Sequence, residues 1–113
     1  MRSKTVATDM PTEDLDRVRE LSRDLRTEKP RSAHDVLGGY ELAARALDKC
    51  RATLAGQAGD YEFNCPLDRR FFQTTGIDAA EFRDFVATGA DDAAVGSWIE
   101  ARAMRVGSGE GSV

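Results

Sequence analysis

Glycine divides this chain into short segments, and in each segment the apolar residues recur at three- and four-residue steps. That spacing places them on one face of an α-helix, whereas a half-buried strand would alternate. Gly56, Gly76 and Gly89 each follow such a segment, and glycine readily takes the left-handed conformation that ends helices. No stripe persists over three heptads, so a long coiled coil is not expected. The pattern predicts an all-α fold: a compact bundle of about five short helices with mostly orthogonal packing.

The expected helices and their limits can be read from caps and breakers. They cover residues 11–26, about 40–55, from Pro66 to Gly76, from Asp78 to Gly89, and from Asp91 or Asp92 to about Met104. Residues 33–39 form a connector that ends in Gly38-Gly39, and residues 61–63 alternate as a short extended piece would. We therefore expect an N-terminal amphipathic helix in residues 1–29, a helical domain in 30–106 and a flexible tail in 107–113.

The composition excludes several classes of protein. A chain of 113 residues has room for one domain. No apolar run approaches the roughly 18 residues that a membrane span needs, and the first six residues are not a secretory signal. A cytoplasmic protein that binds no membrane is expected. The net charge is −4, with acidic and basic residues intermixed, which argues against nucleic acid as a partner.

Metal and cofactor sites also find little support in the sequence. Structural zinc needs four Cys or His ligands, but the chain has only Cys50, Cys65 and His34. No glycine-rich phosphate loop follows a predicted strand, so the usual nucleotide motifs are absent. We expect no metal and no cofactor, two free thiols, and an exposed His34 that Asp35 could orient.

The segment 40–55 is the most informative. Its predicted apolar face carries Leu42, Ala43, Ala46, Leu47, Cys50, Thr53 and Leu54, and its polar face carries Glu41, Arg45, Asp48, Lys49 and Ala52. Arg45 and Lys49 are one turn apart and repel each other unless an acid lies near them. Glu41 and Asp48 could supply that acid on a solvated face. The alternative is a pocket for a carboxylate or phosphate, with Ala52 leaving the space.

Three residues near the third helix complete this candidate site. Cys65 precedes a helix, where the helix dipole stabilises a thiolate, but it lacks a neighbouring base. Asp68 in the first turn most simply caps its own helix; if it also meets Arg45 or Lys49, it forms a buried charge pair. Tyr61 is expected to form a wall, and Cys50 and Trp98 belong to the predicted core.

Two hypotheses of function follow, and the sequence does not decide whether either involves catalysis. The first is a site for an anionic small molecule formed by Arg45, Asp48, Lys49, Tyr61, Cys65 and Asp68, with Cys65 and Asp68 as weak catalytic candidates. The second is a helical module for protein–protein interaction or homodimerisation through the N-terminal helix.

The segment from about Arg31 to Ala101 resembles a family of small bacterial proteins catalogued only as a domain of unknown function. In that family a proline commonly precedes the arginine, where this chain has Ala44. The resemblance implies a domain definition and no catalytic residues. It rests on Leu37-Gly38-Gly39, Arg45, Asp48-Lys49, Arg51-Ala52, Gly56, Gly59, Tyr61, Cys65-Pro66-Leu67-Asp68 and Gly76-Ile77-Asp78.

Overall fold

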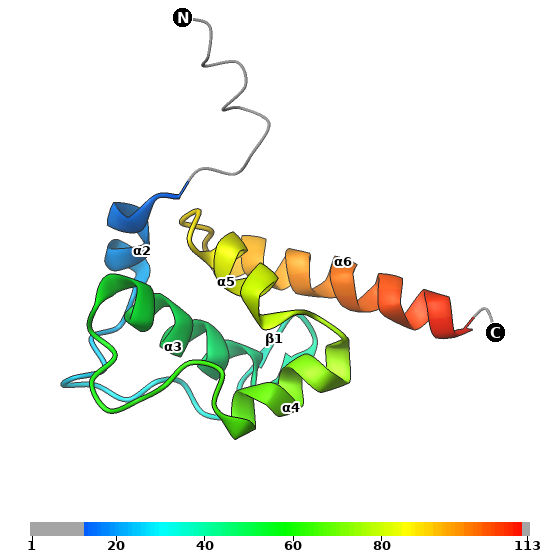
Figure 1. Cartoon of the computed structure of the whole chain (residues 1–113), viewed down its shortest axis with the longest axis horizontal. Coiled ribbons are helices and arrows are strands. Elements are labelled where there is room, and N and C mark those ends of the chain that lie inside the picture. Colours follow the sequence, from blue (N-terminus) through cyan, green and yellow to red (C-terminus); the bar gives the residue numbers. More distant parts are fainter. Residues whose placement is uncertain (1–12, 112–113) are drawn as a thin grey trace, which may run out of the picture.

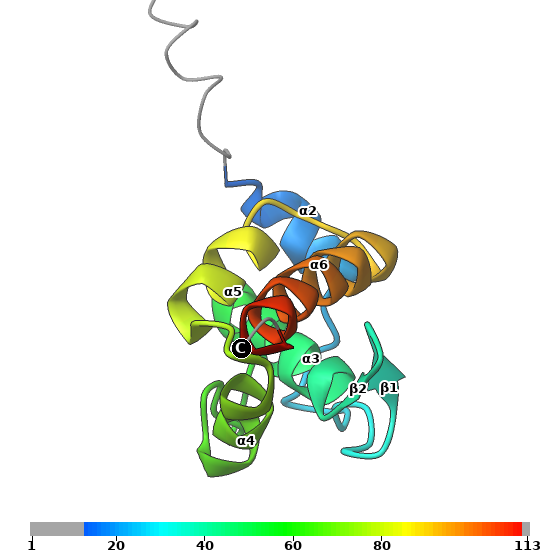
Figure 2. The same ribbon diagram turned by 90° about the vertical axis from the view of Figure 1, so that its right-hand side faces the viewer.

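The protein is a mostly helical bundle, as the sequence predicts (Figures 1 and 2). A computed structural model describes residues 13–111, with side chains as far as Ala103. A two-stranded antiparallel hairpin is the only sheet in that part of the chain. The elements are α2 (Leu15–Leu21), β1 (Val36–Leu37), β2 (Tyr40–Glu41), α3 (Ala43–Ala55), α4 (Pro66–Thr75), α5 (Ala79–Val86) and α6 (Asp92–Gly111).

Helix α3 lies at the centre of the bundle and contacts α2, α4, α5 and β1 (Figure 2). Its predicted apolar face is largely buried, although Thr53 is exposed. Most of the predicted polar face is buried as well: Asp48, Lys49 and Ala52 are at most 3% exposed, whereas Arg45 is partly exposed and Glu41 is exposed. The interpretation of that face as solvated was therefore largely wrong, because neighbouring elements cover α3 on more than one side. The charges on α3 must be matched inside the protein.

The aromatic core packs against α3 from α4 and α5. Phe71, Phe72 and Phe82 have ring centroids 5.1–6.0 Å apart. Trp98, which the sequence assigned to the core, is only partly buried; it stacks on Phe85 at 5.1 Å. Cys50 is 1% exposed, in agreement with its predicted place in the core.

The N-terminal helix is shorter than predicted. Its expected start lies partly outside the described residues, and α2 begins after Asp14, whose side chain accepts a hydrogen bond from the Arg17 amide. It ends at Ser22, which is extended, rather than near Arg26. Beyond it, the Asp24 carboxylate accepts bonds from the Arg26 amide and side chain and stabilises a turn. Such local side-chain bonds compete with the helix.

Helix α2 nevertheless packs on the rest of the protein. Val18 is fully buried, and the Asp14 amide donates to the Ala87 carbonyl at the end of α5. Beyond α2, the Leu25 amide donates to the Gln57 carbonyl after α3. The first described residues are thus held against the C-terminal ends of α5 and α3.

The second predicted helix begins three residues late. Tyr40 and Glu41 pair with Leu37 and Val36 across Gly38 and Gly39, whose φ angles of 62° and 87° suit a tight hairpin turn. Gly38 also fits closely against α6, since a Cβ atom there would lie 2.8 Å from the Gly96 carbonyl oxygen. The Gly-Gly pair therefore makes a turn and not merely a connector.

The segment 61–63, which was expected to be extended but too short to define a sheet, belongs to no strand, and Asn64 takes a left-handed conformation with φ 67° before α4. The end of the last helix differs from the prediction. Helix α6 continues past Met104 to Gly111, although glycine, which recurs in this segment, is a poor helix former. The mobility expected of the tail, 107–113, stays a prediction, and residues 112–113 lie outside the described residues. Among the residues described, no helix has both the length and the apolar character needed to span a membrane.

Candidate functional site

Three residues from two helices meet beside the core: Lys49 of α3, Cys65 just before α4, and Asp68 in the first turn of α4. The Lys49 Nζ atom donates to Cys65 Sγ at 2.9 Å and lies 3.1 Å from Asp68 Oδ2. The side chains of Lys49 and Asp68 are 3% and 1% exposed, whereas Cys65 is partly exposed. We call Lys49, Cys65 and Asp68 the thiol cluster.

The local sequence explains why Cys65 and Asp68 face Lys49. Pro66 occupies the first turn of α4, where its missing N–H is tolerated, and Cys65 is the extended residue before it. Asp68 Oδ2 accepts a hydrogen bond of 2.8 Å from the Asn64 amide. Asp68 thus accepts a bond from the residue before the Cys65 N-cap, not from an amide of α4 itself, and approaches Lys49 at the same time. The charge pair considered from the sequence is therefore observed, and a bond back to the chain before α4 accompanies it.

The two cysteines differ in acidity. Burial raises the pKa of the Cys50 thiol to about 12. At Cys65, burial acts in the same direction, but the hydrogen bond from Lys49 and the amides of Asp68 and Leu67 outweigh it and lower the pKa. These two amides supply electrostatic stabilisation without the geometry of a full capping hydrogen bond. Cys65 is therefore the thiol with the greater thiolate fraction.

Asp68 also has an oxygen without a partner. Its Oδ1 atom is buried and accepts no hydrogen bond from the described residues. Buried carboxylate oxygens normally have partners, because an unpartnered one retains its full cost of desolvation. The thiol cluster thus has one unused acceptor beside a partly exposed sulfur.

Arg45, one turn from Lys49 on α3, pairs with Tyr61 from the loop between α3 and α4. The Arg45 guanidinium carbon lies 5.8 Å from the centroid of the Tyr61 ring, within the range of a cation–π contact. Arg45 Nε is buried and has no hydrogen-bond partner among the described residues. Both side chains are partly exposed.

Asp48 and Glu41 do not compensate the charges of Arg45 and Lys49, contrary to one expectation. Asp48 Oδ1 lies 2.9 Å from Arg31 Nη2, and the Arg31 amide donates to Asp48 Oδ2 at 2.7 Å. Neighbouring positions on a helix point about 100° apart, so Asp48 turns to a different side of α3 from Lys49. Glu41 is exposed, 3.9 Å from His34 Nδ1, and His34 is exposed as predicted.

Arg31 connects Asp48 to Asp92 at the start of α6, with Nη1 2.8 Å from Asp92 Oδ2. Asp92 in turn pairs with Arg51 at 2.9 Å. We call Arg31, Asp48, Arg51 and Asp92 the arginine network. Sequence reasoning missed Arg31, Arg51 and Asp92, because residues 17 and 61 positions apart in the chain show no spacing pattern.

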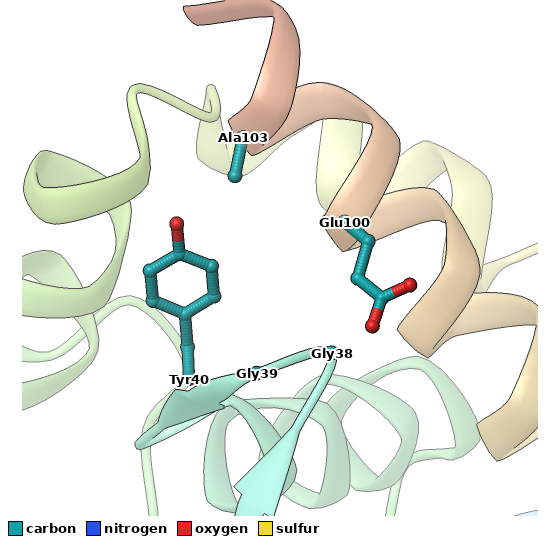
Figure 3. A pocket seen from close by; sticks show the side chains of 5 residues that line it. All are labelled: Gly38, Gly39, Tyr40, Glu100 and Ala103. Atoms are coloured by element: carbon teal, nitrogen blue, oxygen red, sulfur yellow. The ribbon is translucent and has the colours of Figure 1, made fainter. Parts of the chain in front are cut away.

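The expected space beside Ala52 is not present, since Ala52 is fully buried. A hollow of about 490 Å³ instead lies between the hairpin and α6 (Figure 3). Gly38 and Gly39 line one side, and Tyr40 and Glu100 stand on opposite sides of it. No member of the thiol cluster lines this hollow. Within the described residues, no group of three or more His, Cys, Asp and Glu residues is arranged to hold a metal ion.

Comparison with known proteins gives a family without an assigned activity. The model of a family described as a domain of unknown function (DUF5069) matches residues 27–110. A search of curated proteins finds no match. The matched segment contains the whole thiol cluster, the Arg45–Tyr61 pair and the arginine network.

Proposed function

The chain belongs to the DUF5069 family, and we propose that this member binds a small molecule through a carboxylate or phosphate group at Arg45, beside Tyr61 and Cys65. The observation that carries this proposal is the contrast between the two cations of this helix face. Lys49 is paired with Asp68 at 3.1 Å, whereas Arg45 is paired with no acid in the described part of the chain.

A guanidinium in this setting is well suited to an anion. Arg45 is partly exposed, so a ligand can reach it from solvent. Its Nε is covered and lacks an acceptor in the described part of the chain, so a carboxylate or phosphate would bind the terminal Nη groups of the guanidinium, through charge-assisted hydrogen bonds. The ring of Tyr61 restrains the guanidinium, which reduces the entropy lost on binding.

The residues proposed from the sequence then divide into different roles. We propose that Arg45, Tyr61 and Cys65 contact the ligand. Lys49 and Asp68 are buried and act through Cys65. Lys49 and the Asp68 amide lower the pKa of the thiol, whereas the charge of the Asp68 carboxylate raises it. Asp48 belongs to the arginine network and is left out of the proposed site.

Titration of the full chain with inorganic phosphate and with acetate, followed by heteronuclear NMR, tests the proposal. We expect phosphate to shift the amide signals of residues near Arg45 and Tyr61. Arg45→Gln should weaken binding by about tenfold or more, as loss of a charged hydrogen bond predicts, with an unchanged Tm. Arg83→Gln is the matched control, because Arg83 is an exposed arginine on α5. Equal binding by Arg45→Gln and wild type would contradict the proposal.

The alternative, a module for interaction or dimerisation, stays a prediction. Val18 in the centre of α2 is fully buried within the same chain, which supports a role of α2 in its own domain. Deletion of residues 1–29 should then lower the Tm and expose apolar surface. A truncated chain that keeps the Tm but changes from dimer to monomer in light scattering would favour the alternative.

A further inference from the structure

We propose that Cys65 and Lys49 form a reversible covalent link, a sulfur–nitrogen bond that joins α3 to the start of α4 after hydrogen peroxide oxidises Cys65. This modification site does not depend on the proposed binding of an anion. It rests on three features of the thiol cluster: a nitrogen in contact with the sulfur, a sulfur that is accessible from solvent, and a carboxylate that can move protons.

The first feature is the contact between the reacting atoms. Lys49 Nζ lies 2.9 Å from Cys65 Sγ, and such a separation is a near-attack distance. Both residues belong to packed elements, and the side chain of Lys49 is 3% exposed. The amine is therefore held beside the sulfur and does not have to find it by diffusion.

The second feature is unequal access. Cys65 is partly exposed, so a molecule as small as hydrogen peroxide can reach its sulfur. Lys49 and Asp68 are covered. Once the sulfur is oxidised, the Lys49 amine is a nucleophile already in contact with it.

The first step forms a sulfenic acid. The Cys65 thiolate attacks one oxygen of hydrogen peroxide; a sulfur–oxygen bond forms and the oxygen–oxygen bond breaks. The sulfur loses two electrons, which the peroxide gains. The departing hydroxide takes the ammonium proton of Lys49 and leaves as water, and Asp68 Oδ2, 3.1 Å from Nζ, can relay that proton.

The second step is a condensation. The neutral Lys49 amine attacks the sulfur; the sulfur–nitrogen bond forms and the sulfur–oxygen bond breaks. The hydroxide takes a proton from the nitrogen and leaves as a second water. One peroxide is consumed for each link, and no other oxidant is needed. A dithiol reverses the reaction by donating two hydrogens, one to sulfur and one to nitrogen, while it becomes a disulfide.

The test treats the full chain with hydrogen peroxide and measures its intact mass and its tryptic peptides. We expect the mass to fall by two hydrogens and to recover with dithiothreitol. Trypsin should no longer cleave after Lys49 but should still cleave after Arg70, an exposed residue outside the cluster. The peptides containing Lys49 and Cys65 should be recovered as one linked species.

A Cys50–Cys65 disulfide would give the same mass change, so the experiment is repeated with Cys50→Ala. The link should persist in that variant and disappear in Cys65→Ser. In Lys49→Arg, the sulfenic acid should accumulate and react with dimedone. If Lys49→Arg does not fold, the peptide map of Cys50→Ala still tests whether the sulfur–nitrogen link forms.

Three results would overturn the proposal. The first is a Cys50→Ala chain that gains oxygen while trypsin still cleaves after Lys49. The second is a link that retains an oxygen atom, which would contradict the condensation step. The third is a Cys65 that peroxide leaves unchanged.

Discussion

The thiol cluster and the arginine network both use buried charges on α3, yet they differ in the chemistry of their members. In the arginine network, guanidinium groups face carboxylates, with contacts of 2.8–2.9 Å, and none of these groups is a nucleophile. In the thiol cluster, one ammonium is shared between a carboxylate and a thiol. Asp48 and Lys49 are neighbours in sequence and equally buried. Burial of charge therefore does not by itself distinguish a structural ion pair from a candidate site. What distinguishes them is the thiol of Cys65, which contacts the buried Lys49–Asp68 pair.

The two clusters also differ in what they connect. The arginine network joins the segment before β1 to the start of α6 through contacts far apart in the sequence. The thiol cluster joins α3 to the next helix, α4. We therefore expect the network to stabilise the fold and the thiol cluster to combine stability with reactivity.

The largest expected effect is the loss of the carboxylate from the thiol cluster. Asp68→Ala would leave the Lys49 ammonium buried without its acidic partner, and this should lower the free energy of unfolding by about 3–5 kcal/mol. Urea denaturation measures it. The double variant Lys49→Met/Asp68→Leu should recover much of the loss, because it buries no charge. A loss below about 1 kcal/mol would show that the pair is not truly desolvated.

The second effect concerns the thiols. Because the pKa of Cys50 is about 12 and that of Cys65 lies below its ordinary value, their thiolate fractions should differ by about a thousandfold or more near neutral pH. Native-state labelling with iodoacetamide should modify Cys65 first. Its labelling rate should fall only at lower pH than that of an ordinary thiol, and Lys49→Met should move this fall upward. Equal labelling rates for Cys50 and Cys65 would contradict the predicted difference in acidity between the two thiols.

The arginine network should show a smaller effect on stability and none on reactivity. Asp48→Ala removes the acceptor of the Arg31 amide and guanidinium, which should lower the free energy of unfolding by about 1.5–3 kcal/mol. The labelling rate of Cys65 should stay unchanged. A slower Cys65 in this variant would mean that the two clusters are coupled through α3.

The sequence predicted the helical class and part of the thiol cluster for identifiable reasons. Helix periodicity and the glycines that end α3 and α4 are local signals. The approach of Asp68 to Lys49 was one of the alternatives considered, since Asp68 stands in the first turn of a helix that follows α3. The start of α3 was misplaced, because Gly38-Gly39 forms a turn whose partner strands have only two residues each.

The rest depended on tertiary contacts without a local signal. A helix with many charged residues normally has an exposed face, yet α3 is covered because α2 and the hairpin pack on it. Asp48 was assigned to the site because it adjoins Lys49. Its partner Arg31 lies 17 residues away in a connector, and periodicity carries no information about such pairs.

The smallest effect is expected from Asp92, at the exposed edge of the arginine network. Burial alone would raise the pKa of this carboxyl, but its bonds and charge interactions with Arg31 and Arg51 outweigh burial and lower it. A carboxylate with a lowered pKa stabilises the fold above its unfolded-state pKa, and this contribution is lost as pH falls through the folded-state pKa. The Asp92 side chain is 48% exposed, so solvent screens the pair and the contribution should be about 0–1 kcal/mol. Asp92→Asn should therefore lower the Tm slightly at neutral pH and bring it closer to the wild-type Tm in acid. A difference in Tm that does not change with pH would assign the effect of Asp92 to packing and capping at the start of α6 instead of to its charge.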